Sequence, residues 1–334
     1  MRPRILLTHP NGPRANYFGA RALAHLGRLG DVVLNEAEDT PDTARLLALA
    51  KGCNIIVTDR SVHFDAARLD GLPHVAALFR VAVDIRNIDV AAASDRGILV
   101  CHASRSWVPA VAELVVGLMI DISRGISRAN VAYKAGRYPE IRMGRQLAGA
   151  TIGIIGYGPL ARRVAELASA FDMTVLVHDP YVRVDDPRHH AVALDDLVTR
   201  ADYVVPLAVA TDETENLIDA RRLGLMKRTA FLVNLSRGNL VDEAALRSAL
   251  DAGIIAGAAL DVGRAPDQMP EMETARRPDV SATPHIGGLT QEAIEGQALE
   301  AAGQVEALVE GRLPHNAVNS VSARRAIERF GLKT

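Results

Sequence analysis

Three residues with chemically useful side chains stand at the ends of apolar, strand-like runs in the second half of the chain. They are Arg237, Asp261 and His285. An arginine can grip a carboxylate with two hydrogen bonds and polarise an adjacent carbonyl. A histidine titrates near neutral pH, so it can take the hydroxyl proton of an alcohol that loses a hydride. Since the carboxyl ends of the strands in an open α/β sheet form its ligand crevice, we expect these residues to act there together.

Each of these residues also has an ordinary structural explanation. An arginine or histidine after a strand is usually a solvated side chain, and an aspartate at a strand end is often only a turn former. Their joint placement after three strands of one domain is what favours a functional site. His189 and His190, by contrast, stand in an expected loop without further ligands, so we predict no metal site.

A glycine turn between two strands predicts dinucleotide binding. The strand Thr151–Ile155 leads into Gly156, Tyr157 and Gly158, and a helical pattern of apolar residues follows. Gly156 permits a tight turn, and Gly158 lets the backbone approach a pyrophosphate. Ala161 stands where a third glycine is usual, and it is small enough for close helix–strand packing. The helix N-terminus then presents free N–H groups to the phosphates.

An acidic residue after the second strand of this unit indicates which cofactor binds. Asp179 follows Thr174–Val177 and stands 21 residues after Gly158, close to the usual spacing of about 20 for a carboxylate that accepts both ribose hydroxyls. A 2′-phosphate would meet this carboxylate, so the sequence favours NAD over NADP. Arg183 is the residue nearby that argues for the phosphorylated cofactor.

Strand and helix patterns alternate along the chain, which predicts an α/β protein with two doubly wound parallel sheets. We expect a dinucleotide-binding Rossmann domain over 102–288. The segments 1–101 and 289–334 would form a discontinuous, flavodoxin-like substrate domain, because the helix at 290–310 and its tail are too little for a domain of their own. We expect a cleft between the two domains.

An apolar stretch after the first domain predicts one long helix over 109–135. Pro109 stands at its start and Gly136 directly after its end. Leu114 and Leu118 share one face of this helix, with further apolar residues beside them. So much apolar surface indicates packing between domains or between subunits.

The composition excludes several classes of protein. A net charge of −2 provides no basic surface for nucleic acid or for an anionic membrane. The longest apolar stretch, 108–122, contains Glu113 and Asp121, so we do not expect it to span a membrane. Cys53 and Cys101 form neither a disulfide framework nor a metal-ligand pattern, which favours a cytoplasmic protein.

Several stretches resemble the D-isomer-specific 2-hydroxyacid dehydrogenase family, and the resemblance covers nearly the whole chain. The most specific are GYGPLARRVAELASAFDMTVLVHDPY at 156–181, LMKRTAFLVNLSRGNLVDEAALRSAL at 225–250, AGAALDV at 256–262 and TPHIGG at 283–288. The resemblance implies a homodimeric, NAD-dependent oxidoreductase that interconverts a D-2-hydroxy acid and its 2-oxo acid.

The resemblance also implies roles for individual residues. Arg237 would bind the substrate carboxylate and carbonyl, His285 would be the general acid/base, and Asp261 would contact the nicotinamide carboxamide. The loop of Val81, Ala82 and Val83 would offer main-chain N–H groups to the substrate carboxylate. The other cofactor contacts would come from Gly156, Tyr157, Gly158, Pro159, Leu160, Asp179, Leu235, Ser236, Gly287 and Gly288.

Two stretches depart from the family pattern. The family has a glutamate five residues past Asp261 that pairs with the catalytic histidine and orients it, whereas this chain has Pro266 at that spacing. Asp267 would replace it if the loop bends inward, and is otherwise a solvated loop acid. Without a carboxylate partner for His285, we expect reduction to fade at a lower pH than is usual. Trp107 either lines the substrate site and favours an apolar or aromatic tail, or packs between domains.

Two other functions stay open from the residues alone. A protein of the same fold with little catalysis would act as an NAD(H)-sensing regulator, and the missing glutamate favours that alternative. An oxidoreductase that takes hydride from formate or another donor is the second. We predict the hydroxyacid dehydrogenase, because Arg237 and His285 are both retained.

Overall fold

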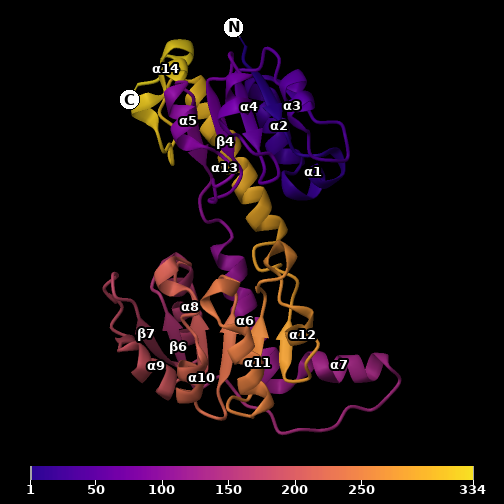
Figure 1. The fold of residues 1–334 in the computed structure, drawn as a ribbon, viewed down its shortest axis with the longest axis vertical. Helices are drawn as coiled ribbons and strands as arrows, with labels where there is room; N and C mark the ends of the chain where they lie inside the picture. The colour runs from indigo at the N-terminus through magenta and orange to yellow at the C-terminus, as the bar shows by residue number, and fades with distance from the viewer. Residues whose placement is uncertain (1, 334) are drawn as a thin grey trace. The chain divides into compact units, whose positions relative to one another are not determined.

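A computed structural model describes residues 2–333 of the chain, which form two compact α/β units (Figure 1). Unit 1 contains 2–106 and 291–333, and unit 2 contains 107–290. We expected the boundaries at 101/102 and 288/289, a few residues earlier. Hydrogen bonds hold the segment before residue 107 in unit 1: Glu300 accepts the N–H of Ser104 at 2.8 Å, and the Ser106 hydroxyl donates to the carbonyl of Ala293 at 3.3 Å.

Over the described residues, unit 1 has one sheet of five parallel strands in the order β2-β1-β3-β4-β5. Successive residues of β1 point to opposite faces, with Ile5 and Leu7 in one core and Leu6 in the other. Both faces are therefore buried, as a parallel sheet requires. The strands are β1 (Arg4–Leu7), β2 (Asp31–Leu34), β3 (Ile55–Thr58), β4 (Ala77–Arg80) and β5 (Leu99–His102).

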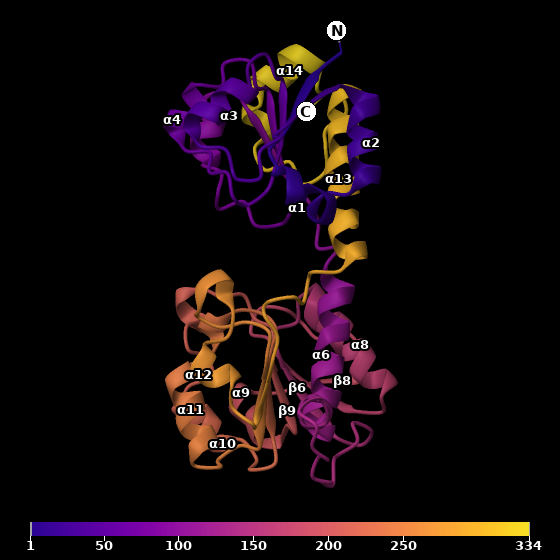
Figure 2. The same cartoon turned by 90° about the vertical axis from the view of Figure 1, so that its right-hand side faces the viewer.

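Helices cover both faces of the unit 1 sheet. On one face α2 (Ala20–Leu29) and α13 (Gln291–Val309) lie side by side (Figure 2), because α13 presents the small residues Ala298, Ala301 and Ala302 to the core. The core on this face also includes residues of α14 (Arg324–Phe330), and α1 (Asn11–Tyr17) contacts α13. The other face is covered by α3 (Thr43–Leu49), α4 (Ala66–Asp70) and α5 (Val90–Asp95).

In the part of the chain that the structure describes, unit 2 has one sheet of seven parallel strands in the order β12-β11-β10-β9-β6-β7-β8. The loop that we expected at His189 and His190 is wrong, because both residues belong to the edge strand β8. The strands are β6 (Thr151–Ile155), β7 (Thr174–His178), β8 (His189–Ala191), β9 (Tyr203–Pro206), β10 (Phe231–Asn234), β11 (Gly257–Leu260) and β12 (Val280–Ala282).

The helices of unit 2 lie in two layers around its sheet (Figure 2). One layer contains α6 (Val108–Arg124) and α8 (Pro159–Ala170), which pack against each other. The other layer contains α9 (Leu194–Arg200), α10 (Ala220–Leu225), α11 (Glu243–Asp251) and α12 (Met272–Ala275).

The single helix that we expected over 109–135 is wrong, because the structure divides it in two. Gly125 adopts a φ of 66° and divides it into α6 and α7 (Ile126–Lys134), and the Asp121 carboxylate accepts the N–H of Ser127 at 2.7 Å across the break. Part of the apolar face that we expected to pack between domains or subunits is used within unit 2. Val115 and Leu118 belong to the core of unit 2 itself.

Two further observations bear on the class of protein. Among residues 2–333, no helix has both the length and the apolar composition needed to cross a membrane. Cys53 and Cys101 are buried and unpaired.

Candidate active site

The glycine turn lies at the point where the strand order of the unit 2 sheet reverses, since β6 pairs with β7 on one side and β9 on the other. Gly156 follows β6 with a φ of 96°, and a Cβ there would lie 2.9 Å from the main chain of Ala208, which follows β9. Only glycine both adopts this positive φ readily and has no Cβ to clash with Ala208. The next glycine, Gly158, caps α8, and apart from its chain neighbours and the backbone of its own helix no described residue lies within 4 Å of the position that its Cβ would occupy. The N-terminus of α8 therefore has room for a phosphate group.

Asp179 is held beside this turn by three main-chain N–H groups. Its Oδ2 accepts from Tyr157 at 2.7 Å, and its Oδ1 accepts from Tyr181 at 2.8 Å and Val182 at 2.9 Å. Burial raises the pKa of the Asp179 carboxyl, but these N–H groups and nearby His178 lower the pKa further, so the net pKa lies below its ordinary value. The carboxylate is thus ionised near neutral pH.

The side chain of Tyr157 turns away from the glycine turn. Its hydroxyl pairs with Nδ1 of buried His189 at 2.8 Å, and Nε2 of that ring lies 3.3 Å from the Ser169 hydroxyl. The residue therefore offers its main chain to the turn and its ring to the interior of unit 2. His189, one of the two histidines at which we predicted no metal site, thus forms hydrogen bonds inside unit 2.

The turn that carries Arg237 is fixed by the buried side chain of Asn234. The Asn234 Oδ1 atom accepts the N–H of Ser236 at 3.1 Å, and its Nδ2 atom donates to the carbonyl of Arg237 at 2.9 Å. Leu235 is buried in the core, whereas Arg237 is exposed and donates to the Ser236 carbonyl at 2.8 Å. A rigid main-chain turn thus supports a guanidinium that is accessible to a ligand.

Asp261 organises the turn that carries His285. Its carboxylate, in a residue only 1% exposed, accepts from the Thr283 hydroxyl at 2.6 Å and from the N–H groups of Ile286 and Gly287, both at 2.8 Å. These bonds clamp both sides of His285, which adopts a φ of 56°. A left-handed conformation is strained for a non-glycine residue and often marks a functional site.

The ring of His285 is oriented by a main-chain carbonyl. Its Nδ1 atom lies 2.7 Å from the carbonyl oxygen of Asp267. Because a carbonyl only accepts, Nδ1 carries the hydrogen, and Nε2 is the nitrogen that can exchange a proton with a ligand. The loop after Asp261 does bring Asp267 to His285, and it does so through its main chain.

This loop closes on itself through main-chain bonds. The N–H of Gly263 donates to the carbonyl of Gln268 at 2.8 Å, and that of Ala265 donates to Met269 at 3.0 Å. Asp267 and Gln268 both adopt positive φ, 56° and 59°. The chain reverses sharply here, which directs the Asp267 carbonyl toward His285.

Arg264 and Glu243 anchor the loop, and the sequence analysis identified neither of them. The Arg264 guanidinium donates to Oδ1 of Asn216 at 2.6 Å and pairs with Glu215 at 2.8 Å. The main-chain N–H of Arg264 donates to Oε1 of buried Glu243 at 3.1 Å. Burial and the neighbouring Glu271 raise the pKa of the Glu243 carboxyl. In the sequence, the charged Arg264 between two small residues, Gly263 and Ala265, could have indicated this anchor.

Comparison with known proteins identifies the family. The model of the NAD-binding domain of D-isomer specific 2-hydroxyacid dehydrogenases matches residues 116–287, over half of the chain. A glyoxylate reductase from Thermofilum pendens is 34% identical over 307 residues, which are 89% of this chain and 91% of that protein. The chain belongs to the D-isomer specific 2-hydroxyacid dehydrogenase family.

Another relative is much longer than this chain. A D-3-phosphoglycerate dehydrogenase from Methanocaldococcus jannaschii is 34% identical over 280 residues, which are 82% of this chain but 53% of that protein. The chain thus spans about half the length of this relative.

The crystal structure of a Thermus thermophilus protein superposes with a TM-score of 0.83 at 30% identity, covering 94% of this chain and 99% of the other. The predicted α/β fold with two parallel sheets is confirmed.

In unit 1 of this family member, the expected carboxylate loop follows β4. The N–H of Val81 donates to the carbonyl of Thr58 at 3.0 Å, and the carbonyl of Ala82 accepts from Ala103 at 3.2 Å. The N–H of Val81 is therefore not available to a ligand. The N–H groups of Ala82 and Val83 are the ones that can serve in this way.

Trp107 lies in unit 2, where it stands directly before α6. Its ring is half-buried against the core of that unit, and a Cβ on Gly288 would lie 3.3 Å from the Trp107 Cβ. The tryptophan thus packs beneath the turn that contains His285. This contact lies within unit 2, and the expected role of Trp107 in lining the substrate site stays a prediction.

Two buried polar residues of unit 1 were missed by the sequence analysis. Arg80 ends β4 and is 6% exposed, and His9 follows β1 and is 3% exposed. Among residues 2–333, Nε of Arg80 and Nδ1 of His9 have no hydrogen-bond partner. A charged residue that ends the apolar run Ala76–Phe79, directly before the expected substrate loop, was the available signal.

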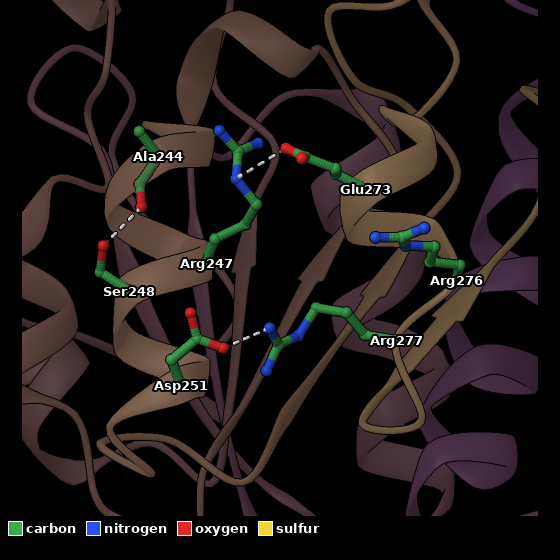
Figure 3. A pocket seen from close by; sticks show the side chains of 7 residues that line it. All are labelled: Ala244, Arg247, Ser248, Asp251, Glu273, Arg276 and Arg277. Atoms are coloured by element: carbon green, nitrogen blue, oxygen red, sulfur yellow. Dashed lines mark hydrogen bonds and ion pairs between the residues drawn. The ribbon is translucent and has the colours of Figure 1, made fainter.

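Two surface hollows of unit 2 contain none of the candidate catalytic residues. One, of about 420 Å³ (Figure 3), is lined by Ala244, Arg247, Ser248, Asp251, Glu273, Arg276 and Arg277. Its charges are paired across it, Arg247 with Glu273 at 3.8 Å and Arg277 with Asp251 at 2.5 Å. The other, of about 530 Å³, lies beside Tyr157 and His189. The candidate catalytic residues lie on the loops at the strand ends and not in these hollows.

Proposed function

We propose that this chain is an NAD(H)-dependent oxidoreductase that interconverts a D-2-hydroxy acid and its 2-oxo acid. The observation that carries the proposal is the 2.7 Å hydrogen bond between Nδ1 of His285 and the carbonyl of Asp267. It directs Nε2 toward a ligand, on a strained turn at the carboxyl edge of the dinucleotide-binding sheet. A purely structural histidine has no need of such a conformation.

The residues of the chain divide the proposed reaction between them. In the oxidative direction Nε2 of His285 takes the proton of the C2 hydroxyl, and in the reductive direction it returns a proton to the C2 oxygen. Arg237 binds the carboxylate and polarises the C2–O bond. Asp261 acts as the residue that positions the His285 turn. When bound, the nicotinamide accepts or supplies the hydride at C2.

We propose NAD rather than NADP as the cofactor. The N-terminus of α8, open above Gly158, fits a pyrophosphate, and the Asp179 carboxylate stands next to it. The lowered pKa keeps Asp179 ionised, so a ribose 2′-phosphate would meet a like charge a few ångströms away. The two ribose hydroxyls, in contrast, are donors that a carboxylate accepts.

We also propose a homodimer. Five large apolar side chains between residues 131 and 143 are exposed, among them Ile141 at 99% and Met143 at 100%. Apolar groups gathered in one exposed segment mark an interaction surface. The second copy of the chain is the partner that this segment fits best, because the family resemblance implies a dimer.

A screen of 2-oxo acids with NADH and NADPH tests the proposed activity. We expect turnover with NADH, and we expect His285→Ala to reduce kcat by about 10²–10⁴-fold, the usual contribution of a general acid or base. NADH binding, measured by fluorescence titration, should not change. His190→Ala, at an exposed histidine of the same unit, is the matched control and should keep wild-type turnover.

Two results would contradict this proposal. Wild-type turnover by His285→Ala would remove the assigned acid/base. A wild-type protein that binds NADH tightly but reduces no 2-oxo acid would support the NAD(H)-sensing regulator instead.

A further inference from the structure

We propose that Glu243 is a positioning residue for His285, and that it acts as a neutral carboxylic acid whose O–H group donates to the carboxylate of Glu271. The inference rests on the proposed function, in which Nε2 of His285 exchanges a proton with the substrate. It adds a role for two carboxyl groups that contact neither substrate nor cofactor in that proposal.

The start of α11 places Glu243 inside unit 2. Glu243 is the first residue of this helix, and Asp242 before it caps the helix by accepting the N–H of Ala245 at 3.0 Å. Glu243 is only 7% exposed, which is rare for a glutamate. Its Oε1 atom accepts the main-chain N–H of Arg264 at 3.1 Å. The side chain therefore ties the start of α11 to the loop that contains Arg264.

The Glu243 carboxyl is packed against the main chain of the loop that orients His285. A Cβ on Gly263 would lie 2.6 Å from Oε1 of Glu243. The N–H of Gly263 donates to the carbonyl of Gln268 at 2.8 Å. The preceding carbonyl, that of Asp267, holds Nδ1 of His285 at 2.7 Å. A shift of the carboxyl therefore moves the carbonyl that orients the ring.

The second oxygen of Glu243 indicates that the group carries a proton. Oε2 is buried, and no N–H or O–H group of the described residues donates to it. A buried carboxylate oxygen without a partner is costly. The Glu271 carboxyl lies within hydrogen-bond reach of this side chain. A proton on Oε2 gives both groups a partner, because the O–H group donates to Glu271.

The surrounding charges decide which of the two carboxyl groups keeps the proton. Glu271 is partly exposed and accepts from the Arg247 guanidinium at 2.7 Å, so it is the ionised member of the pair. Arg247 follows Glu243 by one turn of α11 and also lies 3.8 Å from exposed Glu273 (Figure 3). Glu243 has no such cation bound to it and is therefore the acid.

This pair makes the loop sensitive to pH. Burial, the charge of Glu271 and the hydrogen bond to Glu271 raise the pKa of the Glu243 carboxyl, against smaller effects of the Arg264 N–H and the Arg247 charge. The Arg264 guanidinium itself pairs with Glu215 at 2.8 Å. Stability from the pair is thus fully present below the ordinary pKa of glutamate and is lost as the pH rises through the raised pKa. Ionised Glu243 repels Glu271 and releases the loop.

The oxidative direction separates this titration from that of His285. His285 must accept a proton there, so its own titration makes kcat rise with pH. We expect the wild type to lose kcat again at higher pH, by on the order of 10-fold, because the ring is no longer oriented. The KM for NAD+ should stay within about twofold, since only the proton transfer is affected.

Two substitutions by glutamine remove the titration and keep the shape of the side chain. Glu243→Gln is neutral at every pH, its carbonyl can accept the Arg264 N–H, and its amide can donate to Glu271. In Glu271→Gln the new amide can donate to Glu243, so ionised Glu243 keeps a partner. Both variants should keep the maximal kcat of the wild type within about threefold and lose the alkaline fall.

Two further variants complete the kinetic test. Glu243→Ala should reduce the maximal kcat by on the order of 10-fold, because the loop loses its contact with α11. Glu166→Gln, at an exposed glutamate of α8, is the matched control and should keep the pH profile of the wild type. If Glu243→Ala does not fold, the profiles of the two glutamine variants still decide the question.

Two spectroscopic measurements do not depend on turnover. At about pH 6 an ordinary glutamate is ionised, so the infrared C=O stretch of a carboxylic acid identifies a protonated one. Glu243→Gln should remove this band. The ¹⁵N NMR shifts of the neutral His285 ring report which nitrogen carries the hydrogen. We expect Nδ1 in Glu243→Gln and a mixture of both nitrogens in Glu243→Ala. If both spectra agree but no hydroxy acid is oxidised, the proposed function fails while the inference stands.

Three results would overturn the inference. The first is a wild type without an alkaline fall in kcat, or a fall that Glu243→Gln retains. The second is a carboxylic acid band that is absent from the wild type or unchanged in Glu243→Gln. The third is a Glu243→Ala variant that loses stability in urea but keeps the kcat of the wild type, which would show that the pair is only structural.

Discussion

At the scale of single residues, the conformation of His285 shows how the surroundings support a strained position. A left-handed φ costs a non-glycine residue about 1–3 kcal/mol. The three hydrogen bonds that buried Asp261 accepts, from Thr283, Ile286 and Gly287, offset this cost on both sides of the histidine. The resemblance assigns Asp261 to the nicotinamide, but in the structure its carboxylate binds the turn that carries His285.

Buried histidines make the stability of the fold depend on pH. The pKa of His9 is lowered to about 4 in the folded chain from an ordinary 6.5, so the unfolded chain binds the proton more readily. Stability is fully present above the ordinary value and is lost as the pH falls toward 4. We expect the free energy of unfolding to fall by about 2 kcal/mol between pH 7 and pH 5 from this residue.

Urea unfolding of His9→Gln at both pH values measures this effect. The variant should lose less stability on acidification than the wild type. Some acid sensitivity should remain, since burial also lowers the pKa of His189 in unit 2. His63→Gln, at an exposed histidine of unit 1, should behave like the wild type. An equal loss of stability in wild type and His9→Gln would refute the assignment.

At the scale of elements, the two loops that carry the candidate catalytic residues touch through glycines. Gly238, next to Arg237, lies so close to the main chain of Gly263 that a Cβ on it would overlap the Gly263 carbonyl. Gly263 in turn lies against Glu243 and Pro270, where a Cβ would stand 2.6 Å from each. The loop of Arg237 and the loop that orients His285 therefore position each other.

Gly238→Ala should separate these loops. We expect a loss of stability of about 1–3 kcal/mol, as for other overpacked sites, and a fall in kcat of at least about 10-fold because His285 loses its orientation. Steady-state kinetics and urea unfolding measure the two effects. Gly224→Ala is the matched control, because apart from its chain neighbours and the backbone of α10 no described residue lies within 4 Å of the Cβ position there. It should keep full activity and gain about 0.5–1 kcal/mol as a helix residue.

A Gly238→Ala variant with unchanged kcat would contradict the coupling of the loops. A fall in stability alone, without a fall in kcat, would assign the contact to packing. Only the combination supports a role in positioning His285.

At the scale of the whole molecule, each unit has its own cores on both faces of its own sheet. The exposed apolar segment 131–143 belongs to neither unit's core. Each fully buried apolar side chain contributes about 1.5–3 kcal/mol. An assembly that covers this segment is therefore more favourable than leaving it in water.

The double variant Ile141→Glu and Met143→Glu should convert a dimer to a monomer of 35.8 kDa. Two buried apolar side chains lost together weaken association by on the order of 100-fold or more. Sedimentation or light scattering at micromolar concentration measures the mass. Met272→Glu replaces an exposed methionine of α12 and should leave the dimer intact. A wild-type protein that is already monomeric would remove the dimer proposal.

The sequence by itself determined the features that depend on neighbouring residues. The strand, glycine turn, helix and acid at 151–179 are visible because apolar periodicity, a small residue in a turn and a carboxylate at a strand end are local signals. The same holds for the strands before Arg237, Asp261 and His285. Short or broken elements escaped, such as β8 and the division at Gly125, because a few residues carry too little periodicity.

Only the tertiary structure decided the contacts between residues far apart in the chain. The carbonyl of Asp267 meets His285 across 18 residues, and a main-chain carbonyl has no signature in an amino-acid sequence. Arg80 and His9 share a sheet edge because β1, β3 and β4 are neighbours, an order that local patterns do not encode. Their burial without partners is likewise a property of the packed fold. The sequence therefore indicated which loops carry the chemistry, and the fold decided how each side chain is oriented.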